Sequence, residues 1–439
     1  MTTVETPGQL DRLPAEVLAE PPLRVPVPSQ ARWPGLAAVP HVPVHRAVAR
    51  SIVARAARRL PVRMQFPDGS HWGSGGADAP TMLLLRPEAL FARLGADLRI
   101  GFGEAYMAGD WTTAPSTDLA DLLMPFAERL TVLVPRPLQK LRGMVDERLA
   151  THEENTITGS ASNIARHYDL SNDLFAHFLD PTMTYSSAWF PDVIAGPADL
   201  DLERAQLRKM DGVLDFARVG AGTRLLEIGT GWGALALRAA ERGAQVTSVT
   251  ISAEQQHLAR RRIYEAGRSD RVEVRLEDYR HVDGQYDAIV SVEMIEAVGE
   301  RYWPTYFATL DRLLAPGGRV GLQSITMAHD RMLVTRRSYG WIHKYIFPGG
   351  LIPSLQAIDQ TLAADTSLRV LERRDLGWHY AETLRQWRSR FDAAWPEISA
   401  HGFDVTFRRM WDFYLAYCEA GFRTEYLGVS QLSLGRAPQ

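Results

Sequence analysis

Strand-like runs alternate with segments of helical spacing along the second half of the chain. In the helical segments the apolar residues recur every three or four positions, as in LALRAAERGA after the first run. Strands that alternate with helices predict a parallel sheet with helices on its faces. The expected strands lie at 225–228, 245–250, 271–280, 286–298, 314–325, 368–373 and 426–434. The pattern therefore predicts an α/β fold with a seven-stranded sheet within residues 163–439.

The beginning of the chain has a different pattern. Residues 1–44 are rich in proline and read as an arm without regular structure. Residues 45–63 predict a helix whose apolar stripe is Val48, Ile52, Ala56 and Leu60. Its other face carries five arginines and no acid: Arg46, Arg50, Arg55, Arg58 and Arg59. Two readings stay open, because the stripe can pack on its own domain or the helix can lie on anionic lipid headgroups.

Between this helix and the sheet we expect a smaller α+β domain. Residues 62–112 read as short strands and turns, followed by helices up to about Leu149. The polar stretch THEENTITGSAS, 151–162, is typical of a linker. The predicted order is therefore an arm, an N-terminal domain at 45–150, a linker and the α/β domain at 163–439.

The strongest chemical signal follows the first strand of the α/β domain. Gly229, Gly231 and Gly233 form a tight turn between that strand and a helix, where a ligand can approach the backbone. The spacing E-x-G-x-G-x-G differs from the dinucleotide fingerprint G-x-G-x-x-G. Glu227 at the strand end is suited to accept a hydrogen bond from the ammonium group of an amino-acid ligand.

The next two strand ends complete this candidate cofactor site. Thr250, Ser252 and Gln255 follow the second strand, where a ribose would lie at the crevice outside the strand ends. Asp278 and Tyr279 follow the third strand and are placed to meet an adenine ring. The order of these pieces over 205–330 resembles the class I, Rossmann-like methyltransferase fold, which implies S-adenosylmethionine as the cofactor.

Composition and net charge further narrow the functional class of the protein. A formal net charge of -3 argues against a nucleic-acid-binding protein. Cys418 is the only cysteine, which excludes an internal disulfide, and the twelve histidines show no metal-ligand spacing. No run reaches the roughly 18 apolar residues of a membrane span, and the start lacks a secretory signal. We therefore expect a cytoplasmic protein without a metal, peripheral at the inner membrane face.

Longer motifs resemble one particular family. HYDLSNDLFAHFLDPTMTYSSAWF at 167–190 is similar to the cyclopropane-fatty-acyl-phospholipid synthases and their mycolic-acid-modifying relatives. The likeness continues through LEIGTGWGALA, VTISAEQ, KYIFPGGLIPS and YLAYCEAGFR, and FGEAYMAGDW at 102–111 resembles the N-terminal domain of the phospholipid-acting members. The resemblance covers most of residues 60–435. It also includes the actinobacterial branch that makes 10-methylene or 10-methyl fatty acids.

The resemblance implies a cofactor pocket and an apolar acyl channel. Tyr185 and Ser186 should line the cofactor pocket, and helices within 330–425 should cap the channel. Methylation of a double bond leaves a carbocation, which aromatic faces stabilise. The expected channel residues are Tyr339, Trp341, Tyr345, Phe347, Trp378, Tyr380 and Cys418. Each aromatic is by itself also consistent with ordinary packing, and His167 and Tyr168 can border the site or be structural.

In the resembled family a bound bicarbonate is the base, held by a Cys, a Glu, a His and a Tyr. The matching positions here are Ser187, Glu296, Gln323 and Tyr380, with Ala297 in place of a His. Since Gln323 cannot carry a positive charge, we expect bicarbonate to be held less well. We expect a protein carboxylate to do part of its work: Glu296 first, then Glu153 or Glu154.

The resulting functional prediction is methylation of an unsaturated phospholipid acyl chain of oleoyl type. Methyl transfer, carbocation formation and proton loss would give a 10-methylene chain. Alternatives are cyclopropanation of the same substrate, methylation of a small soluble acceptor, and a catalytically silent lipid-binding protein. A methylene product would need a separate flavin- or nicotinamide-dependent reductase as partner. The oligomeric state stays open, with a homo-oligomer as one option.

Overall fold

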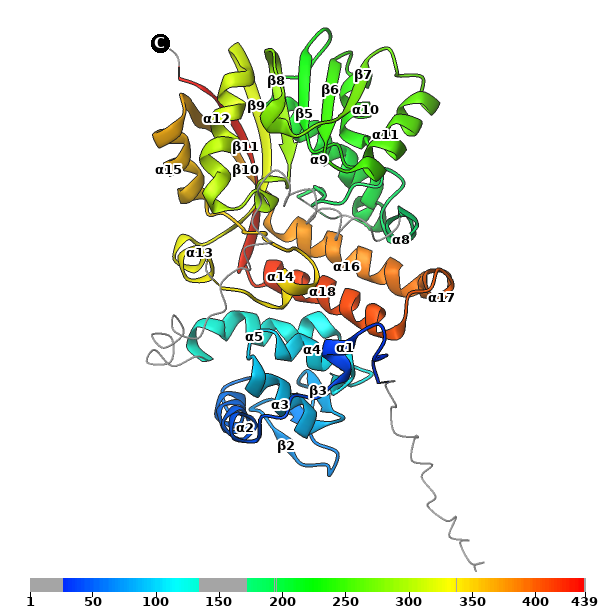
Figure 1. The fold of residues 1–439 in the computed structure, drawn as a ribbon, viewed down its shortest axis with the longest axis vertical. Helices are drawn as coiled ribbons and strands as arrows, with labels where there is room; N and C mark the ends of the chain where they lie inside the picture. The colour runs from blue at the N-terminus through cyan, green and yellow to red at the C-terminus, as the bar shows by residue number, and fades with distance from the viewer. Residues whose placement is uncertain (1–26, 134–171, 193, 195, 337, 438–439) are drawn as a thin grey trace, which may run out of the picture.

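The computed structural model describes residues 27–133, 172–336 and 338–437, apart from 193 and 195. Most of the predicted arm and the whole predicted linker, with Glu153 and Glu154, therefore lie outside the described residues, as do His167 and Tyr168. The described part forms three tiers in Figure 1. The large sheet is at the top, a layer of helices is in the middle, and a small α+β unit is at the bottom.

The upper tier is a seven-stranded sheet in the order β10-β11-β9-β8-β5-β6-β7. Six strands run parallel and β11 is antiparallel to both neighbours. The strands are β5 (Arg224–Ile228), β6 (Gln245–Thr250), β7 (Val272–Leu276), β8 (Tyr286–Val292), β9 (Leu314–Met327), β10 (Leu368–Asp375) and β11 (Leu427–Arg436). All seven predicted strands are present, and the prediction of a Rossmann-like α/β fold is confirmed.

Helices cover both faces of this sheet, because its central strands are apolar on both sides. One face packs against α9 (Leu202–Phe216), α10 (Ala234–Glu241) and α11 (Ala253–Glu265). The other face packs against α12 (Trp303–Leu313) and α15 (Leu355–Asp365). Four short 3-10 turns complete the unit, η2 (Pro197–Leu200), η3 (Tyr279–His281), η4 (Ile295–Ala297) and η5 (Glu300–Tyr302).

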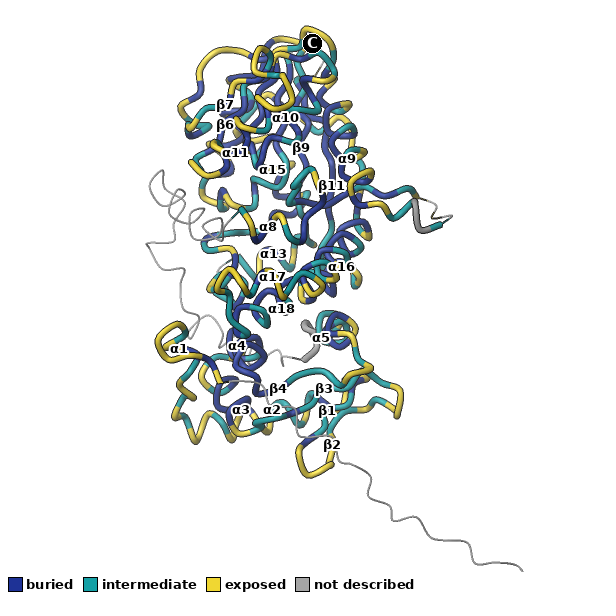
Figure 2. Tube along the Cα trace, turned by 90° about the vertical axis from the view of Figure 1, so that its right-hand side faces the viewer, coloured by how far each residue is buried: buried dark blue, intermediate teal, exposed yellow. Residues whose placement is uncertain are grey.

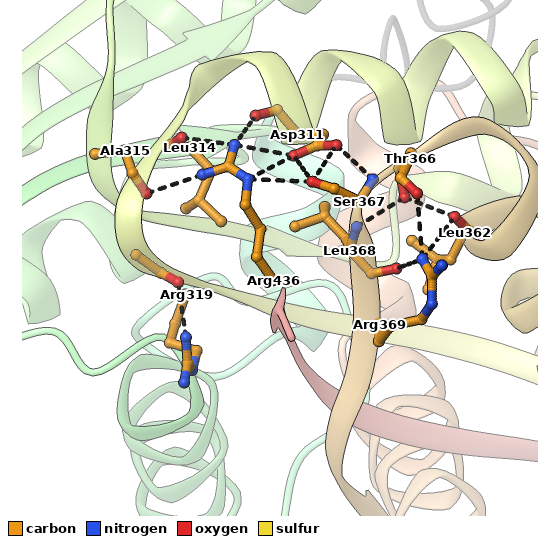
Figure 3. Close-up of polar contacts among 11 residues, drawn as sticks. Asp311, Leu314, Ala315, Arg319, Leu362, Thr366, Ser367, Leu368, Arg369 and Arg436 are labelled. Atoms are coloured by element: carbon orange, nitrogen blue, oxygen red, sulfur yellow. Dashed lines mark hydrogen bonds and ion pairs between the residues drawn. The ribbon is translucent and has the colours of Figure 1, made fainter. Parts of the chain in front are cut away.

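A polar cluster fastens the edge strands to α12 (Figure 3). Arg436 at the end of β11 donates to the Asp311 carboxylate and to the carbonyl oxygens of Leu314 and Ala315. The backbone N–H of Ser367, just before β10, donates to the same carboxylate at 2.7 Å. Asp311 and Arg436 together thus tie the start of β10 and the end of β11 to α12 and to the start of β9.

The lower tier is a small α+β unit with a four-stranded sheet in the order β2-β1-β3-β4. The strands are β1 (Arg63–Gln65), β2 (His71–Trp72), β3 (Thr81–Leu84) and β4 (Trp111–Thr113). The helices are α1 (Pro34–Ala37), α2 (Pro43–Ala57), α3 (Pro87–Ala96), α4 (Gly101–Ala108) and α5 (Leu119–Leu133).

Two sequence expectations were inaccurate in this unit. The interpretation of 62–112 as strands and turns missed α3 and α4, whose apolar residues are buried almost all round and so lack a clean amphipathic signal. The helix predicted at 45–63 ends at Ala57. Pro61 explains the early end, since proline disfavours the helical conformation of the residue before it.

The middle tier joins the two sheets. It contains α8 (Asn172–Phe178), α13 (His329–Thr335), α14 (Trp341–Tyr345), α16 (Gly377–Ala393), α17 (Trp395–Ala400) and α18 (Val405–Arg423). The expected cap at 330–425 is therefore discontinuous, because α15 and β10 within that range belong to the large sheet. Helices α16 and α18 pack on each other and form most of the layer.

Candidate active site

One large cavity links the carboxyl ends of the sheet strands to the lower tier. Its volume is about 1630 Å³. One end is bordered by the glycine turn after β5 and by the loops after β6, β7 and β8. The other end lies among apolar side chains of the lower tier: Ile52, Ala56, Leu60, Met64, Met82 and Leu90. The cavity thus runs from a polar end through the middle tier to an apolar end.

The backbone conformation of the turn after β5 requires glycine. Gly229, Gly231 and Gly233 have φ angles of 97°, 51° and 88°, a region that L side chains rarely adopt. Open space surrounds a Cβ at Gly231, whereas one at Gly233 would lie 3.2 Å from the Ala259 Cβ. Gly229 and Gly231 therefore face the cavity, and Gly233 packs the start of α10 against α11.

Glu227 lies at the polar end with its side chain buried. Its Oε2 accepts a hydrogen bond of 2.5 Å from the Ser248 hydroxyl. Burial raises the pKa of Glu227 to about 8, and the nearby Lys209 ammonium opposes that rise. A buried carboxylate that forms no ion pair with the described residues is suited to an incoming ammonium group. The amino-acid part of S-adenosylmethionine supplies such a group, so this end fits the cofactor.

The residues expected near the ribose and the adenine line the cavity, with one exception. Thr250 and Gln255 line the cavity and hydrogen-bond each other at 2.9 Å. Asp278 and Tyr279 line it too, and Arg280 pairs with the Asp278 carboxylate at 2.6 Å. The exception is Ser252. Its hydroxyl accepts from the Gln255 backbone N–H and caps α11, so it serves the helix rather than the cavity.

Tyr185 and Ser186 line the cavity opposite the strand ends. The Tyr185 hydroxyl is 2.7 Å from that of Tyr414, and its ring stacks on Trp387. Ser186 accepts a 2.6 Å hydrogen bond from the Lys209 ammonium. Both side chains are therefore fixed beside the polar end, where the resemblance implied cofactor contacts.

The positions expected to hold an anion converge on a residue that the sequence interpretation did not single out. Glu293 directly follows β8, and its Oε1 accepts from the Ser187 backbone N–H at 2.9 Å and from Gln323 Nε2 at 2.8 Å. Its Oε2 accepts from the Tyr380 hydroxyl at 3.0 Å. The Glu293 carboxylate thus takes up three of the four expected ligand positions.

Glu296, the first expected candidate for the base, lies beside this group. Its Oε1 accepts from the Ser324 hydroxyl at 2.9 Å and from the Ile325 backbone N–H at 2.5 Å. Its Oε2 is buried and has no hydrogen-bond partner among the described residues. Burial, followed by the charge of Glu293, raises the pKa of Glu296 to about 8. Both glutamates line the cavity.

The expected channel residues divide into two groups. Tyr339, Trp341, Phe347, Tyr380 and Cys418 line the cavity, and burial raises the pKa of the Cys418 thiol to about 12. The prediction was wrong for the other two, which point elsewhere. The Tyr345 hydroxyl donates to Glu104 at 2.7 Å, and the half-exposed ring of Trp378 stacks on Phe190.

Comparison with known proteins places this geometry in a family. The family model for mycolic acid cyclopropane synthetase matches residues 155–432. A tuberculostearic acid methyltransferase of Mycobacterium tuberculosis is 51% identical, covering 92% of this chain and 95% of the relative. A cyclopropane-fatty-acyl-phospholipid synthase of Escherichia coli is 34% identical, covering 82% of this chain and 88% of the relative.

A solved structure shows the same arrangement of the sheet unit. A mycolic acid cyclopropane synthase crystallised with SAH and CTAB is 30% identical, with a TM-score of 0.57. The match covers 62% of this chain and 97% of that chain, so more than a third of this chain has no counterpart in it. S-adenosylmethionine is the cofactor of these enzymes and fits the site built on Glu227 and the glycine turn. The chain belongs to the mycolic acid cyclopropane synthetase family of S-adenosylmethionine-dependent methyltransferases.

Proposed function

We propose that this enzyme methylates the double bond of an oleoyl-type phospholipid acyl chain and releases a 10-methylene chain. The observation that carries the proposal is the cavity, whose far end is lined by aliphatic side chains of α2, α3, β1 and β3. An acyl tail is an apolar ligand of matching chemistry, since burying each CH2 group contributes about 0.8 kcal/mol. A small polar acceptor would leave most of this surface without a partner.

The chemistry follows from the two ends of the cavity. S-adenosylmethionine supplies an electrophilic methyl group at the polar end. When the double bond attacks this methyl group, the new C–C bond forms as the S–CH3 bond breaks, S-adenosylhomocysteine is the leaving group, and the adjacent chain carbon becomes a cation. A hydride shift from the methylated carbon then moves the positive charge onto that carbon. Loss of a proton from the new methyl group produces the methylene branch.

The residues around the polar end protect this cation. Water would trap it, so an enclosed site is required. Tyr380 and Tyr185 are packed among other rings, with Tyr380 4.6 Å from Phe422 and Tyr185 5.2 Å from Trp387 between ring centroids. Aromatic faces attract a cation. We infer that these tyrosines keep water out and stabilise the charge.

The product assignment is supported by one relative. Tuberculostearic acid is a stearic acid with a methyl branch at carbon 10, and the methyltransferase named after it shares 51% identity with this chain. A 10-methylene chain reaches that product by addition of a hydride and a proton. We therefore infer a separate flavin- or nicotinamide-dependent reductase as partner.

Cyclopropanation is the second candidate, because cyclopropane synthases are also relatives. There the proton leaves the new methyl group before a hydride shift, and the ring closes. Liposomes with oleoyl chains, S-adenosylmethionine and purified protein distinguish the two. We expect vinylidene proton signals in the extracted acyl chains. Upfield cyclopropane signals would contradict the methylene assignment, and methylation of soluble acceptors alone would contradict the lipid assignment.

We further propose that α2 contacts the membrane surface. No described helix is long and apolar enough to cross a bilayer. Arg55, Arg58 and Arg59 are exposed around the end of α2, and Val44 and Val48 are exposed on the same helix (Figure 2). Cations beside apolar side chains favour an interface with anionic lipid. Ile52 and Ala56 of the same helix border the cavity, so the exposed residues of α2 lie next to its apolar end.

Co-sedimentation with anionic liposomes tests the membrane contact. We expect Arg55→Glu together with Arg58→Glu to reduce binding by about 30-fold or more, because each basic residue near the surface contributes about 1 kcal/mol. The matched control is Arg261→Glu with Arg268→Glu on the distant helix α11 and the loop after it. Equal binding of both double variants would contradict the proposal. Light scattering in the same preparations tests a homo-oligomer.

A further inference from the structure

We infer that the carboxylate of Glu293 is the catalytic base that accepts the proton from the methylated acyl chain. This inference rests on the proposed function and names a residue for its last step. The Glu293 carboxylate would take the place of the bicarbonate that the family resemblance implies. The Ser187 N–H, Gln323 and Tyr380 already donate to Glu293, so the place of a bound anion is filled by the protein itself.

The backbone at Glu293 supports a functional role. Its φ angle is 50°, a left-handed conformation that is rare for a residue with a side chain. Such a conformation costs on the order of 1–3 kcal/mol and persists where the surroundings hold it. Here the Glu293 N–H donates to the Gln323 carbonyl at 2.8 Å. The unfavourable backbone directs a buried carboxylate into the cavity.

Glu293 and Glu227 line the same cavity, and both lie near Lys209. The buried Lys209 ammonium interacts electrostatically with both Glu293 and Glu227. Glu227 marks the position of the cofactor's amino-acid part, to which the sulfonium is joined by a short chain. The base and the methyl donor therefore meet at the same end of the cavity.

The protonation states favour Glu293 over its neighbours as the acceptor. Three hydrogen-bond donors and Lys209 stabilise its ionised form, although burial still raises its pKa. Burial and the adjacent charge of Glu293 both oppose ionisation of Glu296 and raise its pKa. Burial keeps the Cys418 thiol and the Tyr414 hydroxyl protonated. Among the described residues at the expected anion position, Glu293 is therefore the group best suited to take the proton.

The step balances within the site. A C–H bond of the new methyl group breaks, and its electron pair forms the C=C bond to the cationic chain carbon. The proton moves to a Glu293 carboxylate oxygen and forms an O–H bond there. The proton then leaves to water when the site opens for product release, and Glu293 is ionised again.

Two substitutions at the same position test this role. Glu293→Gln keeps the shape and removes the proton acceptor, and we expect methylation of oleoyl liposomes to fall at least 100-fold. Glu293→Gly removes the side chain at a φ angle that glycine adopts freely, so the fold is preserved. We expect sodium formate or bicarbonate to restore part of the activity of Glu293→Gly and to leave Glu293→Gln inactive.

A binding measurement keeps the test independent of the acyl substrate. Sodium formate should raise the unfolding temperature of Glu293→Gly more than sodium chloride at the same concentration does. For the wild-type protein the two salts should give the same unfolding temperature. S-adenosylhomocysteine should bind both variants within about threefold of wild type. Near-wild-type methylation by Glu293→Gln would overturn the inference, as would a large loss confined to Glu296→Gln. A cyclopropane product from the wild-type enzyme would contradict the proposed methylene product. The activities of these variants would still decide whether Glu293 is the base.

Discussion

At the scale of single residues, the cofactor site depends on groups that lie at strand ends. Glu227, Thr250 and Asp278 end or follow β5, β6 and β7, and parallel strands bring their carboxyl ends to one edge. This regularity is why the residues that line this end of the cavity could be predicted from the sequence. Ser252 was the exception, because a serine just before a helix serves equally well as its cap.

The clearest residue-scale prediction concerns Glu227. Glu227→Gln removes the charge that meets the cofactor's ammonium group and keeps the side-chain volume. Losing a charge-assisted hydrogen bond costs about 1.5–3 kcal/mol, so S-adenosylmethionine affinity should fall about 10- to 100-fold. Titration calorimetry measures this directly. Glu241→Gln on the exposed end of α10 is the control, and equal affinities for the two variants would exclude the assigned contact.

Glu296 gives a prediction on pH and stability. Its folded pKa of about 8 lies above the ordinary 4.5, so the folded state holds a proton that the unfolded state has lost. Stability should therefore decline as pH rises between these values, by up to about 1.4 kcal/mol per pH unit from this group. Denaturant unfolding of wild type and Glu296→Gln from pH 5 to 8 tests it. Parallel curves for the two proteins would refute the pKa assignment.

Glu293 is a residue of the candidate site that was not predicted from the sequence. The expected anion ligands were identified position by position, and Glu296 among them was the first candidate for the base. The signal for Glu293 was its place directly after β8, at the same sheet edge as the cofactor residues. The positive φ angle that turns its side chain toward Ser187, Gln323 and Tyr380 has no signature in a single sequence.

At the scale of elements, the segment FGEAYMAGDW joins the lower tier to the middle one. Glu104 accepts from both Lys344 and Tyr345 of α14, and the Tyr106 hydroxyl donates to Asp412 of α18 at 2.7 Å. Trp111 at its end is fully buried. The motif was recognised from its resemblance to a family, but its role as a contact between tiers needed the structure, because its partners lie more than two hundred residues away.

Gly103 in α4 offers a test of this contact. A Cβ at this position would lie 2.5 Å from the Trp341 ring. Gly103→Leu should therefore separate α4 from α14 and lower stability by about 1–3 kcal/mol, since overpacking forces neighbours to shift. Gly35→Leu in α1 is the control, because open space surrounds that helical glycine. Equal unfolding free energies for both variants would contradict the close approach.

At the scale of the whole molecule, the cavity crosses all three tiers. Parallel-sheet geometry predicted its polar end, and a family resemblance suggested its lipid character. Its extension into the lower tier could not be predicted, because residues 62–112 gave no amphipathic signal for α3. The expected aromatic lining also holds only in part, since Tyr345 and Trp378 make other contacts.

The length of the cavity leads to a prediction on acyl chains. Ala56 lines its apolar end, whereas Ala54 on the same helix does not. Ala56→Phe should shorten the cavity and lower kcat/KM for oleoyl chains at least tenfold relative to shorter unsaturated chains. Ala54→Phe should leave this preference unchanged. Competition between liposomes of different acyl length measures it, and unchanged selectivity in Ala56→Phe would place the chain elsewhere.

The central claim is that this cavity converts a double bond into a methylene branch. Deuterated-methyl S-adenosylmethionine and oleoyl liposomes test it most directly, with the product read by deuterium NMR and mass spectrometry. The account predicts a vinylidene carbon that has lost one deuterium to the base, with the shifted hydride on the neighbouring chain carbon. Deuterium in a cyclopropane ring, or its absence from every acyl chain, would contradict it.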